Sequence, residues 1–125
     1  MVIDTSALLA IFLAEPERDH FLDQLMGADS KRISAAAVVE TGIVLEAKRG
    51  ESAGQEFDLF LVRARLEVVA VDAEQADLAR LAWRKYGKGR HPAGLNFGDC
   101  FAYALAKQRN ETLLYKGDFS RTDLA

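Results

Sequence analysis

Residues 1–14 read MVIDTSALLAIFLA, and the order of these residues decides the predicted fold. The apolar run at residues 1–3 ends at Asp4 and is typical of a short buried strand. The apolar residues after it favour a helix over residues 6–14. A buried strand that ends in an acid and leads into a helix indicates the first unit of a parallel α/β sheet.

The rest of the chain repeats this alternation of short apolar runs and longer helical patterns. Further strands are predicted at residues 32–34, 66–71 and 112–115. Further helices are predicted at residues 16–26, 36–49, 52–65, 72–86 and 96–108. Strands separated by helices pair in parallel through crossover connections. The sequence therefore predicts one domain over residues 1–125, a three-layer α/β/α fold around a mostly parallel sheet of four to five strands.

Several helix starts carry recognisable capping signals. Pro16 suits the first turn of its helix. Capping-box spacing joins Ser52 to Gln55 and Asp72 to Gln75. Asn96 is predicted to cap the last long helix, with Asp99 in its first turn.

Three acidic residues are the only charges within long apolar segments. They are Asp4 in residues 1–14, Glu40 in residues 33–45 and Asp99 in residues 92–106. A carboxylate is rarely buried without a partner, because an unpaired charge in apolar surroundings is costly. Asp4 and a fourth acid, Asp118, follow predicted strands. Glu40 lies in the first turns of a helix that follows a strand, and Asp99 lies in the first turn of another helix. Because these positions meet at one edge of a parallel sheet, we expect the four carboxylates to converge there.

Converging carboxylates with no basic residue beside them indicate a site for a hard divalent cation, Mg²⁺ or Mn²⁺. Two such ions would activate a water and stabilise the leaving oxygen when a phosphodiester is hydrolysed. Each acid also has a structural interpretation that the sequence leaves open. Asp4 and Asp99 could cap their helices, and Asp118 could be a turn residue. The Asp-Thr-Ser start lacks the acidic pair of a response-regulator receiver and the second Asp of an aspartyl phosphatase.

The charge distribution is uneven along the chain. The net charge is −3, yet no acidic residue lies between Asp77 and Asp99. A basic stretch in that interval is predicted to contact the phosphates of a polyanion, with a solvated helix end and loop as the alternative. Its proposed contact residues are Arg84, Lys85, Lys88 and Arg90.

The one cysteine, Cys100, excludes a disulfide framework and is typical of a reducing compartment. No stretch approaches the roughly 20 apolar residues of a membrane span. A cytoplasmic protein with no membrane partner is therefore expected.

Motifs along essentially the whole chain resemble those of the PIN-domain ribonucleases, and within them the VapC toxins of bacterial toxin–antitoxin pairs. The motifs are MVIDTSAL, AVVETG around Glu40, YGKGRH leading into GLNFGDCFAY, and LYKGDF followed by Thr122 and Asp123. The resemblance implies a Mg²⁺- or Mn²⁺-dependent endoribonuclease that has Asp4, Glu40 and Asp99 at its acidic positions. It also implies a VapB-like antitoxin partner and a homodimer.

The fourth acid is carried over to Asp118, although its Gly117-Asp118-Phe119 turn is one residue shorter than in many relatives. A shorter turn could move this carboxylate away from a second metal ion. A non-catalytic PIN-fold module that binds RNA or protein is therefore the alternative function.

Two further groups of residues are expected to assist. Ser6 is predicted to hydrogen-bond a carboxylate or a metal-bound water, or only to cap its helix, with Thr5 and Asn96 as further supporting residues. Apolar residues are dense in the first helix and in the helix that contains residues 56–65. Any that exceed the needs of the core would form a groove for an antitoxin helix. These candidates are Leu9, Phe12, Phe57, Phe60 and Leu61.

Overall fold

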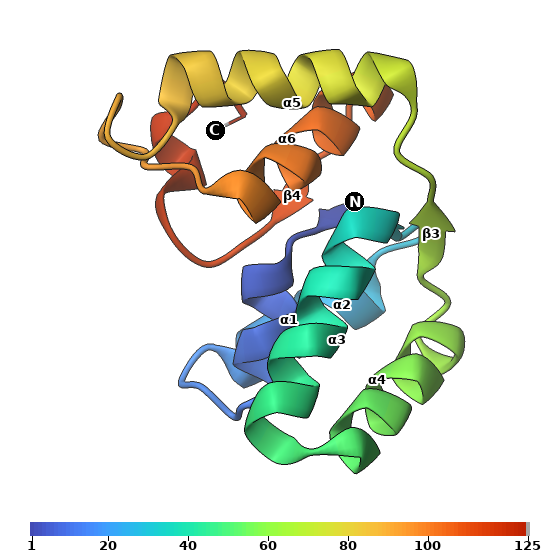
Figure 1. The fold of residues 1–125 in the computed structure, drawn as a ribbon. Helices are drawn as coiled ribbons and strands as arrows, with labels where there is room; N and C mark the ends of the chain where they lie inside the picture. The colour runs from blue at the N-terminus through green and yellow to red at the C-terminus, as the bar shows by residue number, and fades with distance from the viewer. Residues whose placement is uncertain (125) are drawn as a thin grey trace.

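A computed structural model describes residues 1–124, in which four parallel strands lie between helices (Figure 1). The strands are β1 (Val2–Ile3), β2 (Arg32–Ser34), β3 (Glu67–Val69) and β4 (Leu113–Leu114). The helices are α1 (Thr5–Phe12), α2 (Arg18–Gly27), α3 (Ala35–Arg49), α4 (Glu51–Arg63), α5 (Ala73–Tyr86), α6 (Phe97–Arg109) and the 3-10 helix η1 (Asp118–Arg121). The predicted three-layer α/β fold is confirmed.

The sheet order β3-β2-β1-β4 fixes where a ligand site would form. The chain proceeds outward from β1 through β2 to β3 and then returns to the other side of β1 for β4. The direction of winding therefore changes between β1 and β4. In open parallel sheets the crevice beyond the carboxyl ends of the strands at such a point is the usual ligand site.

The two faces of the sheet are covered by different helices. Because successive strand residues point to opposite faces, neighbouring residues of a strand join different cores. Ile3, Ile33 and Leu114 belong to a core that also contains residues of α1 to α4. Val2 and Val69 belong to a core with Leu105 of α6. Helix α5 packs on the outside of α6 (Figure 1).

Helix boundaries differ from the predictions at two places. Helix α4 begins at Glu51 with Gly50 as its N-cap, so the predicted cap by Ser52 is wrong. Gly50 has a φ of 85° and also ends α3, so one residue in the left-handed region separates the two helices. Pro16 lies before α2, whose N-cap is Glu17.

The other predicted caps are formed wholly or in part. Asn96 and Asp99 form a reciprocal capping box at α6. The Asp72 side chain accepts from the backbone N–H of Gln75 at α5. Gln75 completes no box, because its buried amide donates to Ala70 and Gln108 instead.

Candidate active site

Asp4 is held at the carboxyl end of β1, where it is the N-cap of α1 and only 2% exposed. Its Oδ2 accepts from the backbone N–H of Ser6, at 3.0 Å, and from the Ser6 hydroxyl. The Ser6 hydroxyl oxygen in turn accepts from the backbone N–H of Lys116, at 2.9 Å. Ser6 therefore joins Asp4 to the segment that follows the neighbouring strand β4 and fixes the orientation of the carboxylate.

Asp99 lies in the first turn of α6. Its Oδ2 accepts from the backbone N–H of Asn96, at 3.0 Å, and the Asn96 side chain accepts from the Asp99 backbone N–H, at 2.9 Å. Among residues 1–124, nothing donates a hydrogen bond to the second carboxylate oxygen, Oδ1. Asp99 thus caps its helix with one oxygen and leaves the other free for a ligand.

Glu40 on α3 reaches the start of α6, where Gly98 gives it room. A Cβ at position 98 would lie 2.6 Å from Glu40 Cδ and closer still to both carboxylate oxygens. Beside it, the buried Thr41 hydroxyl donates to Thr5 Oγ1 at 3.2 Å. This bond holds α3 against α1, so Glu40 is carried to the sheet edge that also holds Asp4.

The three carboxylates interact electrostatically. Burial raises the pKa of Asp4 to about 6, aided by the charges of Asp99 and Glu40 and opposed by the hydrogen bonds from Ser6. Burial also raises the pKa of Asp99, with the Asn96 hydrogen bond opposing it and the Glu40 charge adding to it. Within residues 1–124, none of the three forms an ion pair. The edge therefore holds negative charge that no described cation neutralises.

Asp118 lies apart from this group. It begins η1, its side chain is exposed, and its Oδ1 lies 3.8 Å from Arg121 Nε. The charges that raise the pKa of Asp4 are those of Asp99 and Glu40, not that of Asp118. Three of the four predicted acids thus interact electrostatically, and Asp118 is not among the groups that shift the pKa of Asp4.

The donor set suits Mg²⁺ or Mn²⁺ in kind, since it consists of carboxylate oxygens without a competing cation. Over the described chain, no three His, Cys, Asp or Glu side chains lie close enough to hold one ion together. Mg²⁺ commonly binds through one or two carboxylates and keeps several waters. Asp4 and the free oxygen of Asp99 match that requirement.

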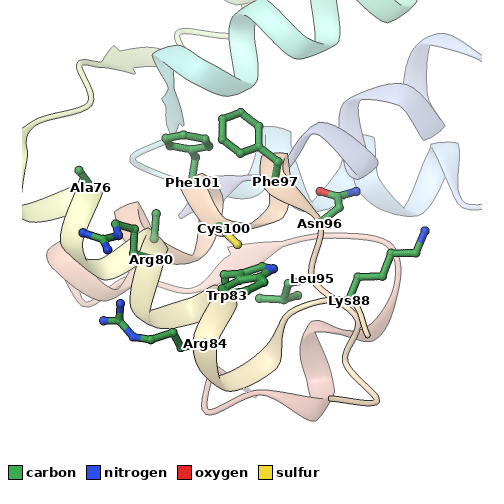
Figure 2. A pocket seen from close by; sticks show the side chains of 11 residues that line it. Ala76, Arg80, Trp83, Arg84, Lys88, Leu95, Asn96, Phe97, Cys100 and Phe101 are labelled. Atoms are coloured by element: carbon green, nitrogen blue, oxygen red, sulfur yellow. The ribbon is translucent and has the colours of Figure 1, made fainter. Parts of the chain in front are cut away.

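The basic stretch borders a cavity of about 790 Å³ between α5 and the start of α6 (Figure 2). Arg84 and Lys88 line this cavity, whereas Lys85 is exposed outside its lining. Arg90 stacks over Trp83, with its guanidinium carbon 4.6 Å from the ring centroid. Two of the four predicted RNA contacts, Arg84 and Lys88, therefore line the cavity that adjoins the start of α6.

The predicted antitoxin residues lie between α1 and α4. Phe12 packs edge-on against Phe57 and Phe60, with ring centroids 5.8 and 5.2 Å away. Phe57 is buried in the core, whereas Leu9, Phe12, Phe60 and Leu61 are half-buried. Two further apolar residues of α4, Leu59 and Val62, are exposed. By helical periodicity they lie on the side of α4 that faces away from Phe57 and Leu61.

Several residues that position the acids could not be recognised from sequence patterns. Thr41 and the Lys116 backbone act through hydrogen bonds across more than 30 residues of chain, which no local pattern reveals. Gly98 was partly recognisable from the sequence. A glycine near the start of a helix costs helix stability, so its presence usually has a packing reason. Trp83 and Phe97 were also missed, although both are exposed aromatic residues in or beside the basic stretch.

This geometry accompanies a family match over almost the whole chain. Residues 1–123 match the PIN domain, so the chain belongs to the PIN-domain family. It is 54% identical to "Ribonuclease VapC" of Mycolicibacterium smegmatis over 100% of this chain and 98% of the relative. It is 52% identical to "Ribonuclease VapC30" of Mycobacterium tuberculosis over 100% of this chain and 96% of the relative. Within the PIN-domain family, the chain thus falls among the VapC ribonucleases.

Solved structures share the fold at lower sequence identity. Mycobacterium tuberculosis VapC20, described as a Sarcin-Ricin loop cleaving toxin, has a TM-score of 0.79 at 18% identity and covers 99% of this chain and 95% of its own. VapBC2 from Rickettsia felis, bound to a DNA fragment from its promoter, has a TM-score of 0.74 at 20% identity, covering 98% and 92%. In the described part of the chain, no helix is both long and apolar enough to cross a membrane.

Proposed function

We propose that this chain is a divalent-metal-dependent endoribonuclease, the toxin of a toxin–antitoxin pair, and that it hydrolyses RNA phosphodiester bonds at the Asp4 edge of the sheet. Its close relatives named as ribonucleases support the reaction class. The observation that carries the proposal is the electrostatic interaction of Asp4 with Glu40 and Asp99 at the point where the winding of the sheet changes direction. Among the described residues, no cation pairs with any of the three.

Mg²⁺ or Mn²⁺, when bound, would lower the pKa of an attacking water and stabilise charge on the phosphate oxygens. Asp4 and Asp99 would hold the ion, with Asp4 oriented by Ser6 and Asp99 by the cap with Asn96. Glu40 would add a third carboxylate, which could serve as the base that accepts a proton. Asp118 is the fourth acid of the proposal and would act from its exposed turn, at a greater distance.

Asp4→Asn and Asp99→Asn should each lower the rate of RNA cleavage by at least about 100-fold, because losing even an indirect partner of a metal ligand costs 10- to 100-fold. The assay is the mapping of cleavage sites on total bacterial RNA with Mg²⁺, with Mn²⁺ and with a chelator. Asp23→Asn, on the exposed face of α2, is the matched control and should cleave like the wild type.

Two results would count against the proposal. Cleavage that persists at wild-type rate in either active-site variant would remove these residues from the site. A folded wild type that binds RNA but cleaves nothing with either metal would favour the alternative of a non-catalytic PIN-fold module.

The proposal includes a VapB-like antitoxin that covers the toxin. The apolar surface on α1 and α4 supports a docking site for an antitoxin helix, formed by Leu9, Phe12, Phe60 and Leu61. Burial of Phe57 gives it a supporting role beneath this surface. A homodimer and a cytoplasmic location, where cellular RNA is available, complete the proposal.

A further inference from the structure

A well-formed hollow on the described surface is lined by none of the four candidate acids. It lies between one face of α5 and the first turns of α6, with a volume of about 790 Å³ (Figure 2). Its floor is apolar and includes Ala79, Leu95 and Cys100. Burial, with the charge of Asp99, raises the pKa of the Cys100 thiol to about 11, so this sulfur is an inert part of the floor.

Aromatic side chains form the walls of this hollow, which we call the α5–α6 pocket. Trp83, the only tryptophan of the chain, lies across from Phe97 and Phe101, as Figure 2 shows. Trp83 is 46% exposed and Phe97 is 81% exposed, although aromatic residues of this size are usually covered. Such exposure leaves flat apolar surface available to a ligand.

Trp83 is held in a fixed orientation. The Arg90 guanidinium lies over the indole ring outside the pocket lining, and its Nε donates to the backbone oxygen of Arg84. A Cβ at position 87 would lie 2.6 Å from the indole Cδ1, so Gly87 lets the ring pack against the backbone. The ring therefore packs against Arg90 and Gly87 while it also lines the pocket.

The charge of the lining selects the kind of ligand. Arg80, Arg84 and Lys88 rim the pocket, and no acidic side chain lines it. A ligand that suits this lining has a flat aromatic part for the walls and negative charge for the rim. Nucleotides have both, and aromatic side chains beside a positive groove are the usual platform for single-stranded nucleic acid.

The pocket shares its α6 wall with the candidate active site. Phe97 and Cys100 line the pocket, while Gly98 packs against Glu40 and Asp99 interacts with Asp4. The first turn of α6 therefore contributes residues to the pocket on one side and to the acidic site on the other. A nucleotide bound in the pocket would lie next to the phosphate presented to the carboxylates.

We infer that the α5–α6 pocket holds an unstacked base of single-stranded RNA, stacked on Trp83, beside the phosphodiester that is cleaved. The inference rests on the proposed function and adds a base site to it. The occupant is a nucleobase and not a helix of another protein, because the cationic rim matches phosphates on both sides of a bound base.

The single tryptophan makes the inference directly measurable. The metal-free full chain, kept in a chelator so that RNA stays intact, is titrated with 12-nucleotide oligo(A), oligo(U) and oligo(C) and with a 12-base-pair RNA duplex. Single strands should quench the tryptophan fluorescence, and the duplex, whose bases are stacked on each other, should not. Quenching by the duplex equal to that by single strands would overturn the inference.

Binding by the variants is followed by the anisotropy of dye-labelled RNA. Trp83→Ala should weaken single-strand binding about 5- to 100-fold, the range expected when one base stack is lost. Trp83→Phe keeps a ring and should retain most of the affinity, and it covers the case in which the alanine variant folds poorly. Leu59→Ala, which removes an exposed apolar side chain from α4, is the matched control.

The outcomes separate this inference from the proposed function. Wild-type affinity and cleavage in Trp83→Ala would overturn the base site and leave the nuclease intact. Loss of self-association in Trp83→Ala without any change in RNA binding would show that the pocket is an interface between copies, which also overturns it. Quenching by single strands without cleavage in Mg²⁺ would support the base site while contradicting the nuclease.

Discussion

The contact between Gly98 and Glu40 shows how closely the candidate site is packed at the level of single residues. Glycine inside a helix costs up to about 1 kcal/mol relative to alanine, so its presence in the first turn of α6 needs a reason. The reason is the Glu40 carboxyl group, which occupies the space of a Cβ. One missing methyl group thereby lets α3 bring its acid to α6.

Gly98→Ala should lower metal-dependent RNA cleavage by about 10-fold or more, because Glu40 must move and a misplacement of about 1 Å can cost 100-fold. The matched control is Gly42→Ala, since a Cβ at that helical position meets nothing within 4 Å. The control should keep its activity and gain a few tenths of a kcal/mol or more in unfolding free energy. Equal cleavage rates for the two variants, each measured by initial velocity, would show that the close contact has no functional role.

At the level of elements, the amino end of α6 is organised by its capping box. Asn96 and Asp99 each satisfy a backbone N–H of the other, so the helix start and the position of the acid are one structure. From the sequence alone, Asp99 could be interpreted either as a helix cap or as a metal ligand. The structure shows that Asp99 caps with Oδ2 while Oδ1 stays free, so the two interpretations are compatible.

Asn96→Ala should lower the unfolding free energy by about 1 kcal/mol, the usual cost of losing an N-cap side chain. Because the Asp99 backbone N–H loses its acceptor, the first turn should fray and cleavage should fall as well. Asn96→Ser provides another capping oxygen and should restore most of the stability. Urea unfolding of the three proteins in a chelator tests this prediction, and indistinguishable midpoints for the Ala and Ser variants would contradict it.

Helices and strands were predictable from the sequence where interactions between neighbouring residues determine them. Apolar runs located all four strands, and Asn96 located the start of α6, because strand burial and capping depend on neighbouring residues. The start of α4 was not predictable from Ser52, since a single left-handed residue, Gly50, both ends α3 and begins α4. The α5–α6 pocket was also out of reach, because its two walls come from separate helices.

For the molecule as a whole, charge is balanced differently at the two edges of the sheet. At the amino edge, Glu111 pairs with the N-terminal ammonium group of Met1 at 2.8 Å and with Arg32. At the carboxyl edge, Asp4 is buried beside two like charges with no described cation. The fold therefore concentrates its electrostatic cost at the candidate active site, as expected where function and stability oppose each other.

This cost has a definite pH dependence in the metal-free protein. The pKa of Asp4 is raised from 3.8 to about 6 on folding, so the folded state binds this proton more tightly than the unfolded chain. The associated stability is present at low pH and is lost as the pH rises from about 4 to above 6. Because Asp4 is almost fully buried, the loss for this one group is about 3 kcal/mol.

Asp4→Asn removes the titrating group but keeps an oxygen that can accept from Ser6. In a chelator, the variant should therefore be more stable than the wild type by up to about 3 kcal/mol at pH 7.5, and the difference should shrink toward pH 4.5. Asp72→Asn is a control of opposite sign, because hydrogen bonds from the backbone of Gln75 and the side chain of Gln108 lower the pKa of Asp72. Asp72→Asn should therefore be less stable than the wild type at pH 7.5, with a difference that shrinks as the pH falls.

Urea unfolding of the wild type and the two variants at a series of pH values measures both differences. A wild type more stable than Asp4→Asn at pH 7.5 would contradict the assignment of uncompensated charge to Asp4.

Divalent metal should reverse the order of stability at neutral pH. A ligand that binds only the folded state stabilises it by about 4 kcal/mol at a concentration 1,000-fold above its Kd, which exceeds the advantage of Asp4→Asn in a chelator. Mg²⁺ or Mn²⁺ should therefore raise the unfolding midpoint of the wild type at pH 7.5 and leave that of Asp4→Asn nearly unchanged. The shift should weaken below pH 6, because protonated Asp4 cannot ligate the ion. Equal shifts in the two proteins would place the metal elsewhere, since only the wild type keeps the carboxylate that the metal would neutralise.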